Sequence, residues 1–329
     1  MHLYPLKFSP IYKERIWGGD RLKTIFGRKD IPNKIEKCGE SWEISAIEGD
    51  LSVVSNGTLE GNNIQELIEI YMDELVGNKT YEKFGLEFPL LVKFLDTSDK
   101  LSIQVHPDNE VANKRHHAWG KSELWYVIDC KKDAELIIGF NRTVSQSEYL
   151  EHLNDGELTS ILNWEKAKKD DVFYIPAGRL HAILDGFLVA EIQQTSDITY
   201  RIYDWDRVDA SGNARELNTE LAIDVLDYTA PKDLEYKTIY DVTKPETEIE
   251  KTPFFTINRI DLDKNSIEKD IYDLDSFVVY MCISGEASIE YDGSSVKMSK
   301  GETVLVPASL HDFTITSASQ AQLLEVYIS

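Results

Sequence analysis

The sequence predicts a mainly β protein built from two small β-barrels, and two observations lead to this prediction. Short strand-like segments separated by glycine, proline and aspartate turns dominate the chain from about residue 172 onward. A weak internal repeat also aligns residues 170–177 (DDVFYIPA) with residues 301–308 (GETVLVPA) without gaps. A histidine follows each copy, His181 in the first and His311 in the second. We therefore expect the same small barrel to be used twice.

The spacing of apolar residues predicts the elements of the first half in order. Between residues 64 and 75 apolar residues recur at steps of three and four, which predicts a helical insertion over about 60–84. Strand-like segments follow at 88–96 and 100–108. Residues 123–140 then indicate two strands around a charged turn.

A second helical insertion is expected over about 145–169. Ser145 and Glu148 form a capping-box pattern at its start, and Asp155-Gly156 divides it. The charged segment 228–252, which contains two prolines, indicates a boundary between domains. We predict a first domain at 1–235, which carries both insertions, and a second domain at 236–329.

Composition and charge exclude several classes of partner. The chain has 329 residues, with 35 Lys and Arg against 58 Asp and Glu, so its formal charge is −23. Binding to nucleic acid or to an anionic membrane needs a basic surface, so neither partner is expected. The three cysteines include no CxxC pair, and the N-terminus has no apolar signal core. We therefore expect a cytoplasmic protein.

One pattern of residues points to a metal site. In a predicted strand, apolar residues alternate with polar ones, which places Gln104 and His106 on one face, about 7 Å apart. Lys121 and Glu123 are also two apart at the start of the next strand, and His181 follows a Pro-Ala-Gly turn. Two imidazoles and two oxygen ligands suit zinc or another first-row divalent ion. Because each residue alone is ordinarily a solvated side chain, the prediction rests on the joint pattern.

These motifs together resemble the type I mannose-6-phosphate isomerases, a family of zinc-dependent cupins, and most of all its short bacterial branch. The resemblance spans about residues 4 to 220 and implies two cupin domains, which are jelly-roll-like β-barrels, with helical insertions in the first. The second barrel is expected to hold no metal, because His311 stands alone and residues 277–280 (FVVY) are apolar where a glutamate would be expected. The segments that carry the resemblance are 12–19 (YKERIWGG), 104–107 (QVHP), 121–123 (KSE), 176–182 (PAGRLHA) and 193–205 (QQTSDITYRIYDW).

The resemblance also implies roles for individual residues. One Zn²⁺ per chain is expected. Lys121 and Arg201 are the expected catalytic residues, and Lys93 and Asp197 are expected to bind substrate. The expected zinc ligands are Gln104, His106, Glu123 and His181.

The implied reaction interconverts mannose 6-phosphate and fructose 6-phosphate through a cis-enediol. A metal ion and Arg201 would stabilise the negative charge that develops on the sugar oxygens. The base that moves the proton is left open among Lys121, a carboxylate and a metal-bound hydroxide. The expected partner is a small sugar phosphate, and the chain is expected to be a monomer or a homodimer.

Two other functions compete with this one. The chain could be another metal-dependent cupin enzyme, such as a dioxygenase or a different sugar-phosphate isomerase. A redox cupin would favour iron or copper with histidine-dominated ligands, and only two histidines fit here. A non-catalytic sugar-binding cupin would have lost part of the ligand set or its cations, whereas Lys121 and Arg201 are both present. Metal content discriminates among the three hypotheses.

Overall fold

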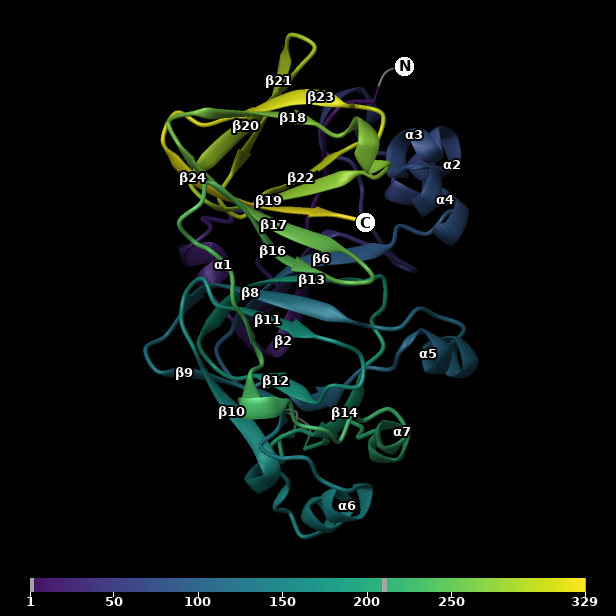
Figure 1. The fold of residues 1–329 in the computed structure, drawn as a ribbon, viewed down its shortest axis with the longest axis vertical. Coiled ribbons are helices and arrows are strands. Elements are labelled where there is room, and N and C mark those ends of the chain that lie inside the picture. The colour runs from purple at the N-terminus through teal and green to yellow at the C-terminus, as the bar shows by residue number, and fades with distance from the viewer. Residues whose placement is uncertain (1–2, 209–211, 329) are drawn as a thin grey trace.

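Four stacked antiparallel sheets form the body of the protein in the computed structural model, which describes residues 3–208 and 212–328. From top to bottom in Figure 1 they have four, six, seven and five strands, and a small two-stranded sheet is added to them. The mainly β prediction is confirmed. The two lower sheets form one barrel, and the two upper sheets form the other.

The seven- and five-stranded sheets form the first barrel. The seven-stranded sheet has the order β15 (Lys237–Thr238), β11 (Val172–Ile175), β8 (Glu123–Cys130), β13 (Phe187–Gln194), β6 (Leu90–Thr97), β2 (Ile11–Gly19) and β3 (Cys38–Ile44). The five-stranded sheet has the order β10 (Leu162–Ala167), β9 (Ala134–Phe140), β12 (His181–Ile183), β7 (Ile103–Val105) and β14 (Tyr200–Tyr203). The two-stranded sheet joins β4 (Ala46–Ile47) to β5 (Asp50–Leu51).

The six- and four-stranded sheets form the second barrel. The six-stranded sheet has the order β1 (Leu6–Lys7), β22 (Thr303–Val306), β19 (Val278–Ser284), β24 (Gln320–Tyr327), β17 (Thr256–Asp263) and β16 (Glu246–Lys251). The four-stranded sheet has the order β18 (Ser266–Asp270), β23 (Asp312–Thr316), β20 (Glu286–Tyr291) and β21 (Ser294–Ser299).

The two barrels repeat one strand order, which accounts for the weak sequence repeat. The order β11-β8-β13-β6 recurs as β22-β19-β24-β17, and β10-β9-β12-β7 recurs as β21-β20-β23-β18. Pairing of Val306 with Val278 matches the pairing of Ile175 with Glu123, so an apolar residue stands where the first barrel has its carboxylate. Strand β23 begins at Asp312, so this residue, and not His311, takes the place of His181.

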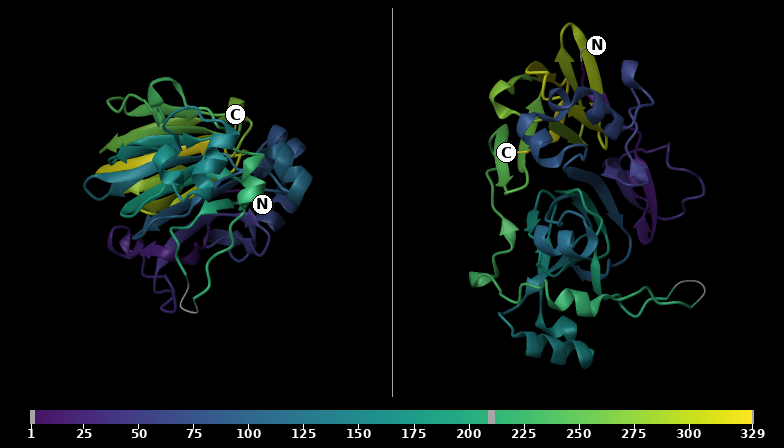
Figure 2. Two further views of the ribbon diagram at one scale, coloured as in Figure 1. Left: turned by 90° about the horizontal axis from the view of Figure 1, so that it is seen from below. Right: turned by 90° about the vertical axis from the view of Figure 1, so that its right-hand side faces the viewer.

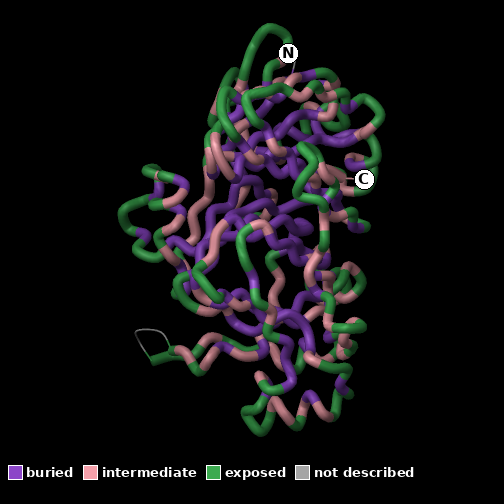
Figure 3. Tube along the Cα trace, turned by 60° about the vertical axis from the view of Figure 1, so that its left-hand side comes forward, coloured by how far each residue is buried: buried purple, intermediate pink, exposed green. Residues whose placement is uncertain are grey.

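Alternation along the strands sorts side chains between two cores. On β8, Leu124 and Tyr126 face the six-stranded sheet and belong to the same apolar core as Val279 of β19. This shared core packs the two barrels against each other. Trp125 and Val127 face the other way, into the first barrel. Figure 3 shows the resulting buried layers running through the middle of the molecule. Polar residues with the parity of Trp125 therefore point into the barrel interior.

The helices lie outside the sheets (Figures 1 and 2). The group α2–α4 packs beside the second barrel, where Ala308 donates a backbone hydrogen bond of 3.0 Å to Leu75. No helix in the described ranges has the length and apolar character needed to cross a bilayer. The α-helices are α1 (Arg21–Thr24), α2 (Ile64–Tyr71), α3 (Asp73–Val76), α4 (Asn78–Phe84), α5 (Asn109–His116), α6 (Gln146–Asn154) and α7 (Thr219–Ile223). The 3₁₀ helices are η1 (Gly57–Leu59), η2 (Leu158–Ile161), η3 (Lys232–Leu234) and η4 (Tyr272–Leu274).

The second helical insertion is shorter than predicted. Ser145 caps α6 by accepting a 3.1 Å hydrogen bond from the backbone N–H of Glu148. The helix ends before Gly156, whose φ is 74°. Helix prediction beyond residue 161 is wrong, because residues 162–167 form β10. Their backbone groups pair with β9, and this pairing outweighs the local helical spacing.

The division at residue 235 stays a prediction, and two short pairings bear on it. Strand β1, from the start of the chain, pairs with β22 of the second barrel. Strand β15, from just after the proposed boundary, pairs with β11 of the first. The proposed domains remain 1–235 and 236–329. Each contributes one short strand that pairs with a sheet of the other.

A buried aspartate on β6 predicts an unusual pH dependence of stability. Asp96 is fully buried, and its carboxylate accepts backbone hydrogen bonds from Leu22, at 3.2 Å to Oδ2, and from Arg21. Burial raises the pKa of Asp96 from 3.8 to about 6. Because the folded form then binds the proton more tightly, this residue's contribution to stability is present below pH 4 and is lost as pH rises through 6.

We expect the Asp96→Asn variant to lack this loss. Relative to it, the wild type should lose about 2 kcal/mol of unfolding free energy between pH 4 and pH 7, since each pKa unit corresponds to roughly 1.4 kcal/mol and part of the change lies below pH 4. Urea denaturation of both proteins across this pH range measures the difference. Parallel pH profiles would contradict the assignment.

Candidate active site

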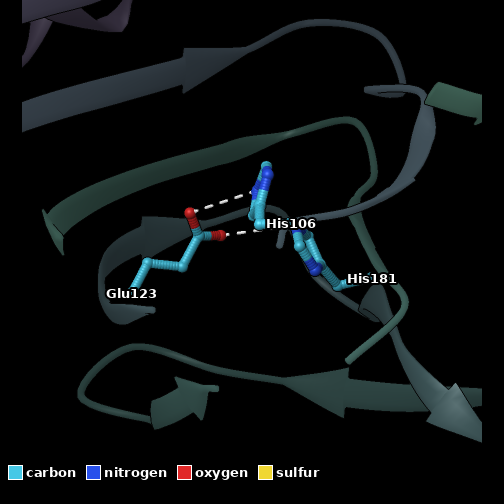
Figure 4. Close-up of side chains that lie close together, drawn as sticks. All are labelled: His106, Glu123 and His181. Carbon is cyan, nitrogen blue, oxygen red and sulfur yellow. Dashed lines mark ion pairs between the residues drawn. The ribbon is translucent and has the colours of Figure 1, made fainter. Parts of the chain in front are cut away.

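Three buried side chains from separate strands of the first barrel meet at one point (Figure 4). His106 directly follows β7, Glu123 begins β8 and His181 begins β12. Strand pairing places Gln104 of β7 between His181 of β12 and Arg201 of β14. Glu123 shares the inward parity of Trp125, so alternation sends its carboxylate into the barrel.

The geometry of His106, Glu123 and His181, which we call the triad, is that of a metal site. The Nε2 of His106 lies 3.5 Å from Glu123 Oε2, and the Nε2 of His181 lies 3.4 Å from Glu123 Oε1. All three side chains are 1% exposed, and their ligand atoms lie within 4.8 Å of one another. Neither carboxylate oxygen has a hydrogen-bond partner, although each is buried. A buried carboxylate without such partners is costly unless positive charge compensates it, and here the Lys121 Nζ lies 3.0 Å from Oε2.

Both imidazoles present a lone pair to the centre of the triad. The Nδ1 of His106 lies 2.8 Å from the carbonyl of Ile198, and the Nδ1 of His181 lies 2.8 Å from the carbonyl of Arg179. Each Nδ1–H therefore donates outward and leaves Nε2 unprotonated. Burial lowers the pKa of His181 to about 4, and burial together with Lys121 lowers the pKa of His106 well below its ordinary value. Two neutral nitrogens and one carboxylate suit a divalent metal ion.

Gln104 adjoins the triad with its amide nitrogen. Its Nε2 lies 3.3 Å from the Nε2 of His181, while its Oε1 accepts a 3.3 Å hydrogen bond from Ser102. Ligation of a metal through Oε1 would need the amide to turn over. The role of Gln104 as a ligand therefore stays a prediction, whereas its position beside the triad agrees with the sequence pattern.

A cavity of about 420 Å³ opens beside the triad, and Gln104 and Lys121 line it. Lys121 reaches the triad, with its Nζ 3.0 Å from Glu123 Oε2 and 3.3 Å from His106 Nε2. The cavity wall brings together all five predicted residues outside the triad: Lys93, Gln104, Lys121, Asp197 and Arg201. Asp197 is exposed and lies at the rim. A larger hollow of about 700 Å³ lies over the four-stranded sheet, away from the triad.

Lys93 is a fixed cation in the cavity wall. Its Nζ pairs with Glu191 Oε1 at 2.8 Å, and both side chains are less than 10% exposed. Burial alone would lower the pKa of Lys93, but Glu191 and Glu40 outweigh it and raise the pKa. Burial likewise opposes ionisation of Glu40, but Lys93 and Arg15 hold the pKa of Glu40 at about 2. Lys93 and Glu40 therefore both stay charged at neutral pH.

Arg201 differs from Lys93, because no carboxylate in the described residues is seen to pair with it. Its Nη1 donates to the carbonyl of Glu216 at 2.9 Å, and its Nε donates to Ser102 Oγ at 3.3 Å. Burial and the neighbouring Arg215 lower the pKa of Arg201 below its ordinary value. A half-buried cation beside another cation favours an anionic ligand in the cavity.

Sequence reasoning missed several residues that line the cavity. Glu191 had a usable signal, since it is a lone carboxylate inside the apolar strand 187–192 and has inward parity. Among the other missed charged residues, Arg15 and Glu40 lie on β2 and β3, whose pairing has register shifts, and Arg215 lies in a loop, so spacing alone gave their side chains no direction. The missed charged residues are Arg15, Glu40, Glu191 and Arg215.

The duplicated barrel and the buried triad together define a protein of two cupin-type barrels with a candidate metal site in the first. Residues 5–149 match the phosphomannose isomerase type I catalytic domain, and residues 245–328 match the mannose-6-phosphate isomerase cupin domain.

Curated relatives and solved structures match almost the whole chain. The mannose-6-phosphate isomerase ManA of Bacillus subtilis is 37% identical over 315 residues, with 94% of this chain and 95% of that protein covered. The mannose-6-phosphate isomerase of Streptococcus mutans is 35% identical, with 93% of each chain covered. The crystal structure of the Bacillus subtilis mannose 6-phosphate isomerase superposes with a TM-score of 0.85 at 33% identity, covering 98% of this chain and 99% of that one. The chain belongs to the type I phosphomannose isomerase family.

Proposed function

We propose that this protein interconverts mannose 6-phosphate and fructose 6-phosphate. Membership of the family supports the reaction, and one observation carries its assignment to this site. The buried Glu123 carboxylate, whose oxygens accept no hydrogen bond, faces two neutral imidazoles, and it pairs with the Lys121 Nζ at 3.0 Å at the wall of a cationic cavity. This arrangement puts a metal site and a group that can carry a proton beside a space of about 420 Å³.

The metal that we propose is Zn²⁺, one per chain. His106, Glu123 and His181 would hold it, with Gln104 as the fourth ligand, since two imidazoles and oxygen donors suit zinc. When bound, zinc supplies a Lewis acid that lowers the energy of negative charge on the substrate's oxygens.

Lys121 is the residue that we propose to move the proton. The reaction breaks the C2–H bond of the open-chain aldose and forms a C–H bond at C1, while a proton moves from the C2 hydroxyl to the C1 oxygen. The Lys121 Nζ lies on this wall and contacts both Glu123 and His106. An amine that takes the proton from C2 and returns it at C1 of the cis-enediol leaves atoms and charge balanced.

Arg201 and Lys93 supply the positive charge that the substrate needs. Arg201 is free of carboxylate partners among the described residues, so its charge is available to oxygens that become negative in the enediol. Lys93 is fixed by Glu191 and is suited to orient sugar hydroxyls, as is Asp197 at the rim. The net charge of −23 does not oppose a phosphate, because the local charge of the cavity decides its binding.

The assay that tests this function follows fructose 6-phosphate formed from mannose 6-phosphate by the full chain. In D₂O, solvent deuterium should appear at C1 of the fructose 6-phosphate, because a base on the protein exchanges with solvent. Mannose without phosphate should react far more slowly. Folded, zinc-loaded protein that leaves mannose 6-phosphate unchanged would contradict the proposal. A cytoplasmic location, and a monomer or homodimer, stay predictions.

A further inference from the structure

Lys121 lies just outside the strand that fixes its neighbour Glu123. Glu123 is the first residue of β8 and pairs with Gln193 of β13 and Ile175 of β11. Lys121 precedes the strand, and its own backbone makes one hydrogen bond of 3.0 Å, to the carbonyl of Pro107. Strand pairing thus fixes the proposed metal ligand Glu123, whereas Lys121 must be positioned by contacts outside the strand.

A chain of two side-chain amides holds the residues on both sides of Lys121. The backbone N–H of Ser122 donates to Gln194 Oε1 at 2.9 Å. Gln194 Nε2 donates to Asn109 Oδ1 at 3.0 Å, and the backbone N–H of Gly120 donates to the same oxygen at 2.9 Å. Gln194 is 6% exposed and uses both ends of its amide in this chain.

The contact at Gly120 is closer than any other residue would allow. A Cβ built on Gly120 would lie 2.5 Å from the backbone nitrogen of Asn109. The segment is therefore pressed against the first residue of α5. A second backbone hydrogen bond of 3.2 Å runs from the N–H of Gln194 to the carbonyl of Ser122. Both sides of Lys121 are thereby fixed to elements that do not bear the triad carboxylate.

We propose that Gln194, acting through Ser122 and through Asn109 to Gly120, is the positioning residue for Lys121. The inference rests on the function proposed above, in which the side-chain amine of Lys121 moves the proton. A displacement of about 1 Å in such a group costs roughly 100-fold in rate. Gln194 does not touch the cavity, so its effect on the reaction is indirect.

Gln194→Met keeps the length of the side chain and removes both of its hydrogen bonds. We expect kcat for mannose 6-phosphate to fall roughly 10- to 100-fold, with KM within about threefold of wild type and one zinc per chain retained. Asn56→Leu is the matched control. Its amide likewise uses both ends, accepting from Lys7 N–H at 2.8 Å and donating to the carbonyl of Pro5 at 3.1 Å, and it does not line the cavity. The control should lose stability and keep kcat.

Introducing Gln194→Met into a Lys121→Ala background tests whether the effect passes through the lysine. We expect the second change to add less than about twofold to the loss caused by Lys121→Ala. Asn109→Ala breaks the same chain of amide hydrogen bonds at its other end. If Gln194→Met does not fold, Asn109→Ala should show the same fall in kcat and the same lack of a further loss in the Lys121→Ala background.

The outcomes separate this inference from the proposed function. Unchanged kcat in Lys121→Ala would overturn the role proposed for Lys121, and the positioning inference with it. A Lys121→Ala loss with wild-type kcat in Gln194→Met overturns the positioning inference alone. Loss of zinc in Gln194→Met, or a full further loss in the Lys121→Ala background, also overturns it, because the residue would then support the triad and not the lysine.

Discussion

The Glu123→Gln variant is expected to bind no stoichiometric metal and to lose roughly 1,000-fold or more in kcat for mannose 6-phosphate. The change removes the only negative charge of the triad and keeps its shape. Both Glu123 oxygens are buried without hydrogen bonds, and Oε2 lies 3.0 Å from the Lys121 Nζ, so the carboxylate is placed to face positive charge. Metal analysis after gel filtration and initial-rate assays measure the two effects.

The matched control for this variant is Glu325→Gln. Glu325 is a buried carboxylate of the second barrel, 2.9 Å from the Lys269 ammonium group and hydrogen-bonded by Tyr280 at 2.7 Å. Its substitution should cost stability and leave metal content and kcat near wild type. Stoichiometric metal in folded Glu123→Gln would place the ion elsewhere and refute the triad.

The Arg201→Met variant should lose roughly 100- to 1,000-fold in kcat/KM, while its metal content stays at one per chain. Arg201 pairs in register with Gln104 and reaches the cavity, but its hydrogen bonds go to Ser102 and to the carbonyl of Glu216. Removing it therefore takes away charge that is available to the substrate and leaves the triad intact. Steady-state kinetics with mannose 6-phosphate give the result.

Arg115→Met is the control for loss of an arginine. Arg115 lies on α5, where it contacts Asp224 and donates a 3.1 Å hydrogen bond to the carbonyl of Leu221 outside the cavity. It should keep kcat/KM within about twofold of wild type. An Arg201→Met enzyme with unchanged kcat/KM would show that the cation has no part in the reaction.

The sequence predicted the triad because its residues sit where alternation and turns give direction. Glu123 and His181 are each the first residue of a strand, and a Pro-Ala-Gly turn precedes His181. The repeat around Pro176 and Pro307 predicted the duplicated barrel, which strand order confirms. Local sequence patterns thus predicted the features that depend on short-range geometry, namely the direction of the triad side chains and the repeated barrel.

Features that depend on distant pairing were out of reach. Residues 162–167 have helical spacing and become β10 because β9 offers a free edge. Arg15 and Glu40 enter the cavity from β2 and β3, and their direction depends on register shifts between these strands. The amide chain through Gln194 joins residues 85 positions apart, so no local signal announces it.

Titration of metal-depleted protein with Zn²⁺ links the triad to the reaction in one measurement. The activity towards mannose 6-phosphate should rise from near zero in proportion to bound zinc and saturate at one zinc per chain. Under the same titration, His106→Ala should gain neither stoichiometric zinc nor activity. Full activity in thoroughly depleted wild-type protein, or saturation of His106→Ala at one active zinc, would contradict a catalytic metal held by His106, Glu123 and His181.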